Sequence, residues 1–259
     1  MDSIILIKEK DVAYITLNRP KVFNSFDTGM RKELLKALED CGADPSVRAV
    51  CITGEGRAFC AGQDLTESAD SETPLSFQTA LTYQYNPIVL KIRQLEKPVV
   101  AAVNGVAAGA GANIALACDI VVAAESAAFV QAFSKIGLIP DLGGTWILPR
   151  LIGFGRASAV MMLGEKIMAK EAVAMGMIYK FFSDDVFKNE VISIMENLAK
   201  MPTKGLALTK KALNESVFAG FEQQLAHEAN FQSQAGDTAD YAEGVNAFIQ
   251  KRTPDFKGF

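Results

Sequence analysis

Two short, uninterrupted apolar runs most constrain what this chain can fold into. The runs are PVVAAV at positions 98–103 and DIVVAA at positions 119–124. Continuous runs of this length are typical of strands that are buried on both faces, as in the parallel sheets of α/β proteins. The residues between them, 110–118, are small and apolar and predict a helix. A buried strand, a helix and a second buried strand in this order predict an α/β fold.

The segments on either side extend this pattern. Residues 4–8 and 12–17 predict an antiparallel hairpin, and Asp27-Thr28 predicts the start of a capped helix. We predict an α/β core over residues 1–200, which holds the active site, and a helical C-terminal extension over residues 201–259. The other expected elements are strands at 49–53, 99–103, 120–124 and 178–182 and helices at 76–95, 110–118, 144–151, 157–163, 169–175, 184–200 and 203–213, with breaks at Pro87 and Pro202.

The bulk properties exclude several classes of function. A net charge of −4 argues against nonspecific binding to nucleic acid. The four cysteines show no CxxC spacing and the single histidine is His227, so no metal centre is expected. The N-terminus lacks the features of a signal peptide, and no apolar run approaches the roughly 20 residues of a membrane span. We expect a soluble cytoplasmic protein that binds neither nucleic acid nor membrane.

Motifs for common cofactors and nucleophiles are absent from the sequence. No GxGxxG follows a strand and no GxxxxGKS/T occurs, so a nucleotide cofactor is not supported. No GxSxG elbow occurs either, and His227 has no orienting partner nearby in a serine-rich turn. We expect His227 at the surface or at a helix interface, and no Ser-His or Cys-His catalysis.

Two turns of small residues offer backbone N–H groups just before expected helices. Gln63 follows Ala61-Gly62, and Ala110 lies between Gly109 and Gly111. Small residues allow the main chain to approach a ligand closely, and a helix N-terminus directs N–H groups at negative charge. Two such groups around a thioester carbonyl would stabilise an enolate. Composition alone favours the simpler interpretation, in which Gly-Ala-Gly allows tight packing of a helix on a strand.

Asp141 is the carboxylate that stands out in the segment 129–150, FVQAFSKIGLIPDLGGTWILPR. It lies between Pro140 and Leu142-Gly143, which is good turn chemistry, and a lone aspartate there is usually a turn residue or a cap. Its neighbours, Leu138 among them, are mostly apolar. If some of them surround the carboxyl group, desolvation would raise its pKa toward the range of a general base.

Three motifs in a fixed order resemble the crotonase (enoyl-CoA hydratase/isomerase) superfamily. They are the segment 129–150, the loop 103–112 and the run 59–65, FCAGQDL, and the resemblance extends from Asn18 to Gly258. It implies a ClpP-like spiral of strand-strand-helix units with a helical C-terminal extension for oligomerisation and closure of the coenzyme A site. It also implies a homotrimer or a homohexamer.

The resemblance assigns chemistry to residues already singled out. In crotonase relatives, the amides that match Gln63 and Ala110 form the oxyanion hole. The two glutamates that activate water in the hydratases align with Asn113 and Phe133, which cannot accept a proton from water. Hydration by the usual machinery is therefore not expected. Asp141 matches the catalytic carboxylate of several other branches and takes the acid/base role.

Further residues match the substrate-binding segments of relatives. Some match the path of the coenzyme A moiety, although a solvated lysine or a packed phenylalanine explains any one of them equally well. Asp64 follows an oxyanion donor, but an acid there commonly caps the next helix. Residues 66–85 carry no readable motif, and a mobile lid over the acyl group is our hypothesis for them. The predicted substrate-binding set is Lys21, Phe23, Ala61, Gly62, Asp64, Gly109, Asn113, Phe133, Leu138, Phe248 and Lys251.

These features together predict an acyl-CoA isomerase. One carboxylate and an oxyanion hole suffice to move a proton through a thioester enolate, with no cofactor beyond the coenzyme A of the substrate. The nearest resemblance is to isomerases of phenylacetate degradation that act on an epoxidised ring and also shift double bonds. The alternatives are an enoyl-CoA hydratase that works in an unusual way and a noncatalytic relative that binds acyl-CoA or RNA. The net charge of −4 argues against binding to RNA.

Overall fold

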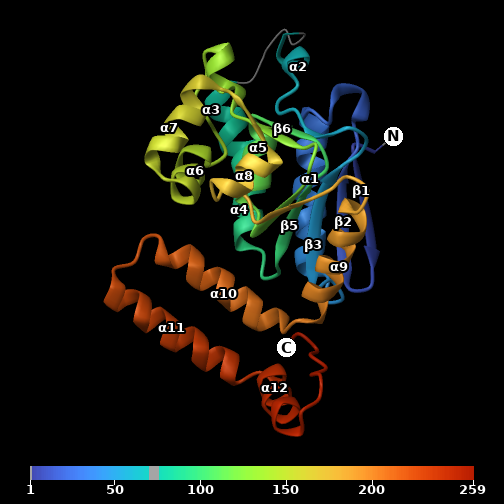
Figure 1. The fold of residues 1–259 in the computed structure, drawn as a ribbon, viewed down its shortest axis with the longest axis vertical. Helices are drawn as coiled ribbons and strands as arrows, with labels where there is room; N and C mark the ends of the chain where they lie inside the picture. Colours follow the sequence, from blue (N-terminus) through green and yellow to red (C-terminus); the bar gives the residue numbers. More distant parts are fainter. Residues whose placement is uncertain (1, 70–75) are drawn as a thin grey trace.

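Two β-sheets and the helices that cover them form the core of the protein (Figure 1), seen in a computed structural model that describes residues 2–69 and 76–259. The larger sheet has the strand order β1-β2-β3-β5-β7-β10. β1 is antiparallel to β2, and the other neighbours are parallel. β5 is buried along its whole length, as the apolar run predicts. Its strands are β1 Ile4–Glu9, β2 Val12–Leu17, β3 Ala49–Gly54, β5 Val99–Val103, β7 Ile120–Ala124 and β10 Lys180–Phe182.

The smaller sheet has the order β4-β6-β8-β9 and completes the spiral. β3, β5 and β7 each lead within a few residues into one of its parallel strands, and β9 pairs antiparallel to β8. The sequence pattern predicts none of these four strands, because a strand of three residues is too short to show a period. The repeated passage from the larger to the smaller sheet confirms the spiral implied by the resemblance. The strands are β4 Ala58–Cys60, β6 Val106–Ala108, β8 Ala128–Val130 and β9 Lys166–Met168.

The helices of the core begin and end close to where the sequence predicts. The carboxylate of Asp27 accepts a hydrogen bond from the N–H of Met30 at 2.7 Å and caps α1, as expected. The helical region expected over 76–95 is divided just before Pro87: α3 passes through a π-helical turn, Leu81–Tyr85, into α4, whose first turn contains Pro87. The helices are α1 Thr28–Ala43, α2 Leu65–Ala69, α3 Phe77–Ala80, α4 Asn86–Gln94, α5 Ala110–Ala117, α6 Gly144–Ile152, α7 Phe154–Leu163, α8 Ala169–Ala174 and α9 Phe187–Lys200.

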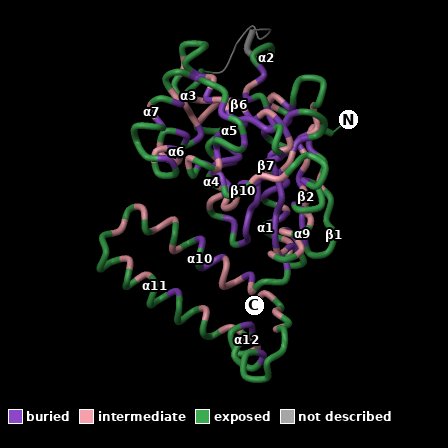
Figure 2. Tube along the Cα trace, viewed as in Figure 1, coloured by how far each residue is buried: buried purple, intermediate pink, exposed green. Residues whose placement is uncertain are grey.

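The last three helices, α10 Thr203–Ser216, α11 Phe221–Gly236 and α12 Ala239–Gln250, extend away from the sheets (Figure 1). Figure 2 shows most of their residues exposed or half-buried, whereas α5 and the central strands β3, β5 and β7 are largely buried. Lys210 ties α10 to the core, because its buried ammonium group lies 2.8 Å from a carboxylate oxygen of Asp119. The boundary expected near residue 200 stays a prediction.

The structure bears on the expected absence of a membrane span and on the proposed lid. No helix in the described ranges is long and apolar enough to cross a membrane. The segment proposed as a lid, 66–85, includes residues 70–75, which lie outside the described residues. The lid therefore stays a hypothesis.

Candidate active site

The segment that carries Gln63 packs directly against the N-terminus of α5. A Cβ atom on Gly111 would lie 2.3 Å from the carbonyl oxygen of Cys60, so no side chain fits there. Gly62 has a φ of +98°, and a Cβ atom on it would lie 3.5 Å from the backbone nitrogen of Ala110. The small residues thus serve tight packing, as the simpler interpretation holds. The same packing brings the two candidate backbone donors into one place.

The two candidate donors, Gln63 and Ala110, have suitable backbone geometry. Gln63 forms a parallel bridge with Phe26, in which Phe26 bonds the carbonyl of Gly62 at 2.8 Å and the N–H of Asp64 at 3.0 Å. Successive N–H groups of an extended segment point to opposite sides, so the N–H of Gln63 faces away from Phe26. Ala110 is the first residue of α5, where N–H groups have no partner within the helix.

Gly109 sets the direction of the helix that Ala110 begins. Its φ of +51° and ψ of −123° form a sharp bend between β6 and α5. Its own N–H donates to the carbonyl of Val130, at the end of β8, at 2.9 Å. The bend is thereby fixed to the smaller sheet, and the N–H of Ala110 has a fixed orientation.

Asp141 lies in the turn that precedes α6, and the turn interpretation is correct for its backbone. The carbonyl of Asp141 accepts a hydrogen bond from the N–H of Gly144 at 2.8 Å. The side chain, however, does not act as a helix cap. Its Oδ1 atom is buried and has no hydrogen-bond partner among the described residues. Burial raises the pKa of the carboxyl group to about 6, against a smaller lowering by its own N–H. A carboxylate with this pKa can accept and return a proton near neutral pH.

The positions matched to the hydratase glutamates are both buried and carry no carboxylate. Asn113, on the first turn of α5, is 0% exposed, and its side-chain amide donates to the carbonyl of Asp141 at 2.9 Å. Phe133 lies in a 3-10 turn, Ala132–Ile136, and its ring lies 3.7 Å from the position of a Cβ atom on Gly109. Leu138 is half-buried and its N–H donates to the carbonyl of Phe133 at 3.0 Å. These apolar groups fit the desolvation of the carboxyl group.

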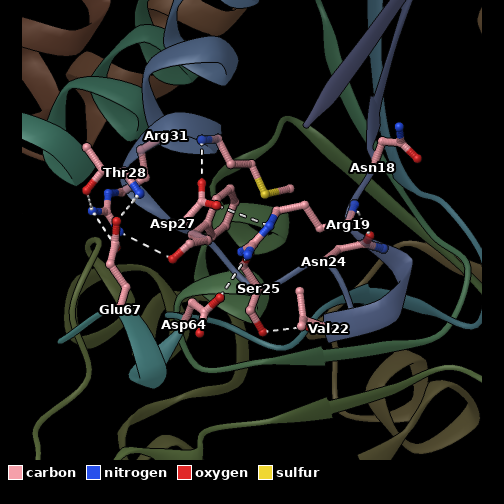
Figure 3. Close-up of polar contacts among 12 residues, drawn as sticks. Asn18, Arg19, Val22, Asn24, Ser25, Asp27, Thr28, Arg31, Asp64 and Glu67 are labelled. Atoms are coloured by element: carbon pink, nitrogen blue, oxygen red, sulfur yellow. Dashed lines mark hydrogen bonds and ion pairs between the residues drawn. The ribbon is translucent and has the colours of Figure 1, made fainter. Parts of the chain in front are cut away.

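Asp64 has the structural role that its sequence position favours. Arg19 lies between α1 and the segment of Asp64, and its guanidinium group is 2.9 Å from the Asp64 carboxylate (Figure 3). The same carboxylate accepts hydrogen bonds from the hydroxyl group of Thr66 at 2.6 Å and from its N–H at 3.2 Å, at the start of α2. The bonds from Thr66, and then the one from Arg19, hold the pKa of Asp64 below its ordinary value. Asp64 therefore has the environment of a cap and not of a base.

A second arginine, Arg31, connects the same segments and was missed by the sequence analysis. It is 4% exposed and donates to the hydroxyl group of Tyr85 at 3.1 Å. It also donates to the carboxylate of Glu67 at 3.2 Å (Figure 3). Burial, opposed by Arg31 and supported by the charge of Asp141, raises the pKa of Tyr85 to about 12. The sequence feature that could have indicated a buried arginine is the position of Arg31 on the apolar face of α1, three residues before Leu34.

The residues predicted for coenzyme A fall into two groups within one chain. Lys21 and Phe23 are exposed, and the carbonyl of Phe23 accepts a hydrogen bond from the N–H of Ala61 at 3.0 Å. This group therefore lies next to the candidate oxyanion hole. Phe248, which is 85% exposed, and Lys251 belong to the end of α12, far from α5 in Figure 1. A single chain does not bring them to the site.

The described residues offer neither a metal site nor a catalytic site at the single histidine. The described residues contain no group of three His, Cys, Asp or Glu side chains that could hold a metal ion. His227, on α11, lies 3.0 Å from the carboxylate of Glu215 on α10. It is therefore at a helix interface, as the sequence predicts.

Comparisons with known proteins place the chain in a family. The model of the enoyl-CoA hydratase/isomerase family matches residues 8–258. The chain therefore belongs to the enoyl-CoA hydratase/isomerase family. The resemblance to the crotonase superfamily is confirmed.

Individual relatives cover almost the whole chain. A 1,2-epoxyphenylacetyl-CoA isomerase of Escherichia coli is 45% identical over 260 residues, which are 100% of this chain and 99% of that protein. A probable enoyl-CoA hydratase of Rhodobacter capsulatus is 46% identical over 95% of both chains. Among solved structures, a putative enoyl-CoA hydratase/isomerase of Mycobacterium abscessus is 35% identical, with a TM-score of 0.93 over 98% of both chains.

Proposed function

We propose that this protein isomerises acyl-CoA thioesters, with Asp141 as the group that moves the proton. The observation that carries the proposal is the state of the Asp141 carboxyl group: its Oδ1 atom is buried without a partner among the described residues, and burial raises its pKa to about 6. Asp64, the other aspartate of the candidate site, is held as an anion by Thr66 and Arg19. The site thus offers one carboxylate that is suited to proton exchange.

The proposed reaction uses one proton and no second reactant. The ionised Asp141 removes a proton from the carbon next to the thioester carbonyl, and the electron pair moves to the carbonyl oxygen. The N–H groups of Gln63 and Ala110 stabilise the resulting enolate. The protonated Asp141 then returns the proton farther along the acyl chain, and the double bond moves. Coenzyme A is part of the substrate, and the proposal requires no other cofactor.

For the substrate, we propose 2-(1,2-epoxy-1,2-dihydrophenyl)acetyl-CoA, with double-bond shifts in enoyl-CoA esters as a second activity. Support comes from the Escherichia coli relative, which is an isomerase of 1,2-epoxyphenylacetyl-CoA and matches the full length of the chain. Hydration of an enoyl-CoA ester is the alternative, because the Rhodobacter capsulatus relative is a probable enoyl-CoA hydratase. Asn113 and Phe133 weigh against hydration, because neither can take a proton from water.

The first experiment follows the conversion of a cis-3-enoyl-CoA into its conjugated 2-enoyl form by absorbance. Wild type and Asp141→Asn are compared, and binding of a CoA ester is measured for both. Loss of conversion in the variant, with binding retained, supports the proposal. A variant that converts the ester as fast as wild type contradicts the assignment of Asp141. If neither protein converts it, parallel assays with the ring epoxide and with hydration of a 2-enoyl-CoA decide between the two functions.

We further propose that the chain acts as a cytoplasmic homotrimer or homohexamer. Support comes from the C-terminal helices, which extend from the core and expose large apolar side chains of Leu213, Phe218, Phe221 and Leu225. Exposed apolar surface of this kind often marks an interface between chains. Light scattering coupled to gel filtration tests this, and a monomer at micromolar concentration would contradict it.

A further inference from the structure

The side-chain amide of Asn113 lies between the turn of Asp141 and the end of β8, where Gln131 follows the last residue of the strand. The Nε2 atom of Gln131 donates to the Oδ1 atom of Asn113 at 2.8 Å. The Nδ2 atom of Asn113 then donates to the carbonyl of Asp141 at 2.9 Å. Asn113 and Gln131 are 0% and 2% exposed, so water does not compete for these bonds. The two amides thus form a directed chain of hydrogen bonds that ends on the backbone of Asp141.

Asn113 belongs to the same helical turn as the candidate oxyanion donor. Its N–H donates to the carbonyl of Gly109 at 3.1 Å, and Ala110 lies within that turn. The side chain of Asn113 therefore connects the helix that presents the Ala110 N–H to the turn that presents the Asp141 carboxylate. The distance between the base and the oxyanion hole depends on this connection.

The packing around the Asn113 amide leaves no room for adjustment. Gly144 also donates to the carbonyl of Asp141, and a Cβ atom on Gly144 would lie 2.5 Å from Nδ2 of Asn113. The amide of Asn113 can accept from Gln131 and donate to a carbonyl at the same time. A carboxylate at position 113 could accept but not donate, and a leucine could do neither.

We propose that Asn113 is a positioning residue that fixes the Asp141 carboxylate relative to the Ala110 N–H, and that Gln131 fixes the orientation of the Asn113 amide. This rests on the proposed isomerase function. Asn113 acts through the backbone of Asp141 and not through the substrate. Loss of its amide should leave binding of the CoA ester in place and slow the chemical step, because a base that is displaced by about 1 Å from its proton can lose about a hundredfold in rate.

The test compares Asn113→Leu and Gln131→Met with wild type. For each protein, kcat and KM for a cis-3-enoyl-CoA are measured between pH 5 and pH 9, together with Tm. Asn113→Leu keeps a similar volume but removes both hydrogen bonds, and we expect kcat to fall by about a hundredfold while KM changes less than about threefold. Gln131→Met leaves the bond from Asn113 to Asp141 possible, and we expect a smaller loss in kcat, about threefold to tenfold.

A second readout separates positioning from a general loss of stability. When the turn of Asp141 is released, its carboxyl group gains water, so the acid limb of the pH profile should move to lower pH in Asn113→Leu. Tyr85, the titratable side chain that responds to the charge of Asp141, has a pKa of about 12 and does not titrate in this range. Leu38→Ala, in the buried core on α1, is the control, with an expected loss of Tm and an unchanged acid limb.

Each outcome decides the proposal. An Asn113→Leu variant with kcat within threefold of wild type and the same acid limb overturns it. If that variant does not fold, Gln131→Met decides, and an unchanged kcat and acid limb there overturn the proposal in the same way. Asp141→Asn distinguishes the two levels of inference. If Asp141→Asn is active, the proposed function itself fails, and if it is inactive while Asn113→Leu is fully active, only the positioning role fails.

Discussion

The raised pKa of Asp141 predicts that replacing this residue with the neutral asparagine makes the protein more stable. Burial raises the pKa from an ordinary value of 3.8 to about 6, so the folded state holds this proton more tightly than the unfolded state. Above pH 6 the folded protein must carry an anion that its environment disfavours. Asp141→Asn removes this cost, and we expect the variant to be more stable than wild type at neutral and alkaline pH.

The magnitude follows from the two pKa values. Each pKa unit corresponds to 1.36 kcal/mol, so a difference of about 2 units destabilises the wild type by about 3 kcal/mol at pH 8. At pH 5, between the two values, the same linkage gives about 1.5 kcal/mol, and below pH 3.8 it vanishes because both states are protonated. Because part of the carboxyl group reaches solvent, we expect a stability gain of about 2 to 3 kcal/mol at pH 8.

Urea denaturation of both proteins at pH 5, 6.5 and 8, at one protein concentration, measures this difference. The new amide can add or lose contacts of its own, but such an offset is the same at every pH. The decisive quantity is therefore the change with pH, and the advantage of the variant should shrink by about 1 kcal/mol or more from pH 8 to pH 5. A difference that stays constant across this range would refute the burial argument for Asp141.

Three further substitutions test the packing and the ion pairs that hold the candidate site and attach α10 to the core. Gly111→Ala should destabilise the protein by about 2 kcal/mol or more in urea, because the new methyl group meets the carbonyl of Cys60; an unchanged midpoint would show that α5 can shift. Lys210→Met leaves the carboxylate of Asp119 with one cation fewer, and calorimetry should show a loss of about 3 kcal/mol. Arg19→Met should lower kcat more than it raises KM, because the segment after the oxyanion donor loses its tether; equal changes in both would argue for a binding role instead.

The sequence predicts the larger sheet well because its strands carry a local signal. The hairpin of β1 and β2 and the buried runs of β5 and β7 lie where their patterns place them. The smaller sheet carries no such signal, because each of its strands has only three residues. Its existence depends on pairing between segments far apart in the chain, and no pattern within a short window records that pairing.

The candidate site divides in the same way. Small residues, proline and turn chemistry mark the loops of Asp141, Gln63 and Ala110, but their predicted roles come from the family resemblance. Gln131 and Tyr85 were not identified, because their roles come from contacts with residues 18 and 54 positions away, respectively. An amide or a phenol in an ordinary segment looks the same whether it is exposed or lies between two functional loops.

The two aspartates of the site show why position alone does not make a base. Asp64 is fixed through its carboxylate, by Thr66 and Arg19, and these bonds lower its pKa and stabilise the anion. Asp141 is fixed through its backbone carbonyl, by Gly144 and Asn113, and the Oδ1 atom of its carboxylate has no partner among the described residues. A carboxylate that is held by its own charge resists protonation, whereas one that is held by its backbone can gain and lose a proton while the turn stays in place. The separation of backbone anchoring from side-chain chemistry therefore supports the proposed role of Asp141 in proton transfer and the structural role of Asp64.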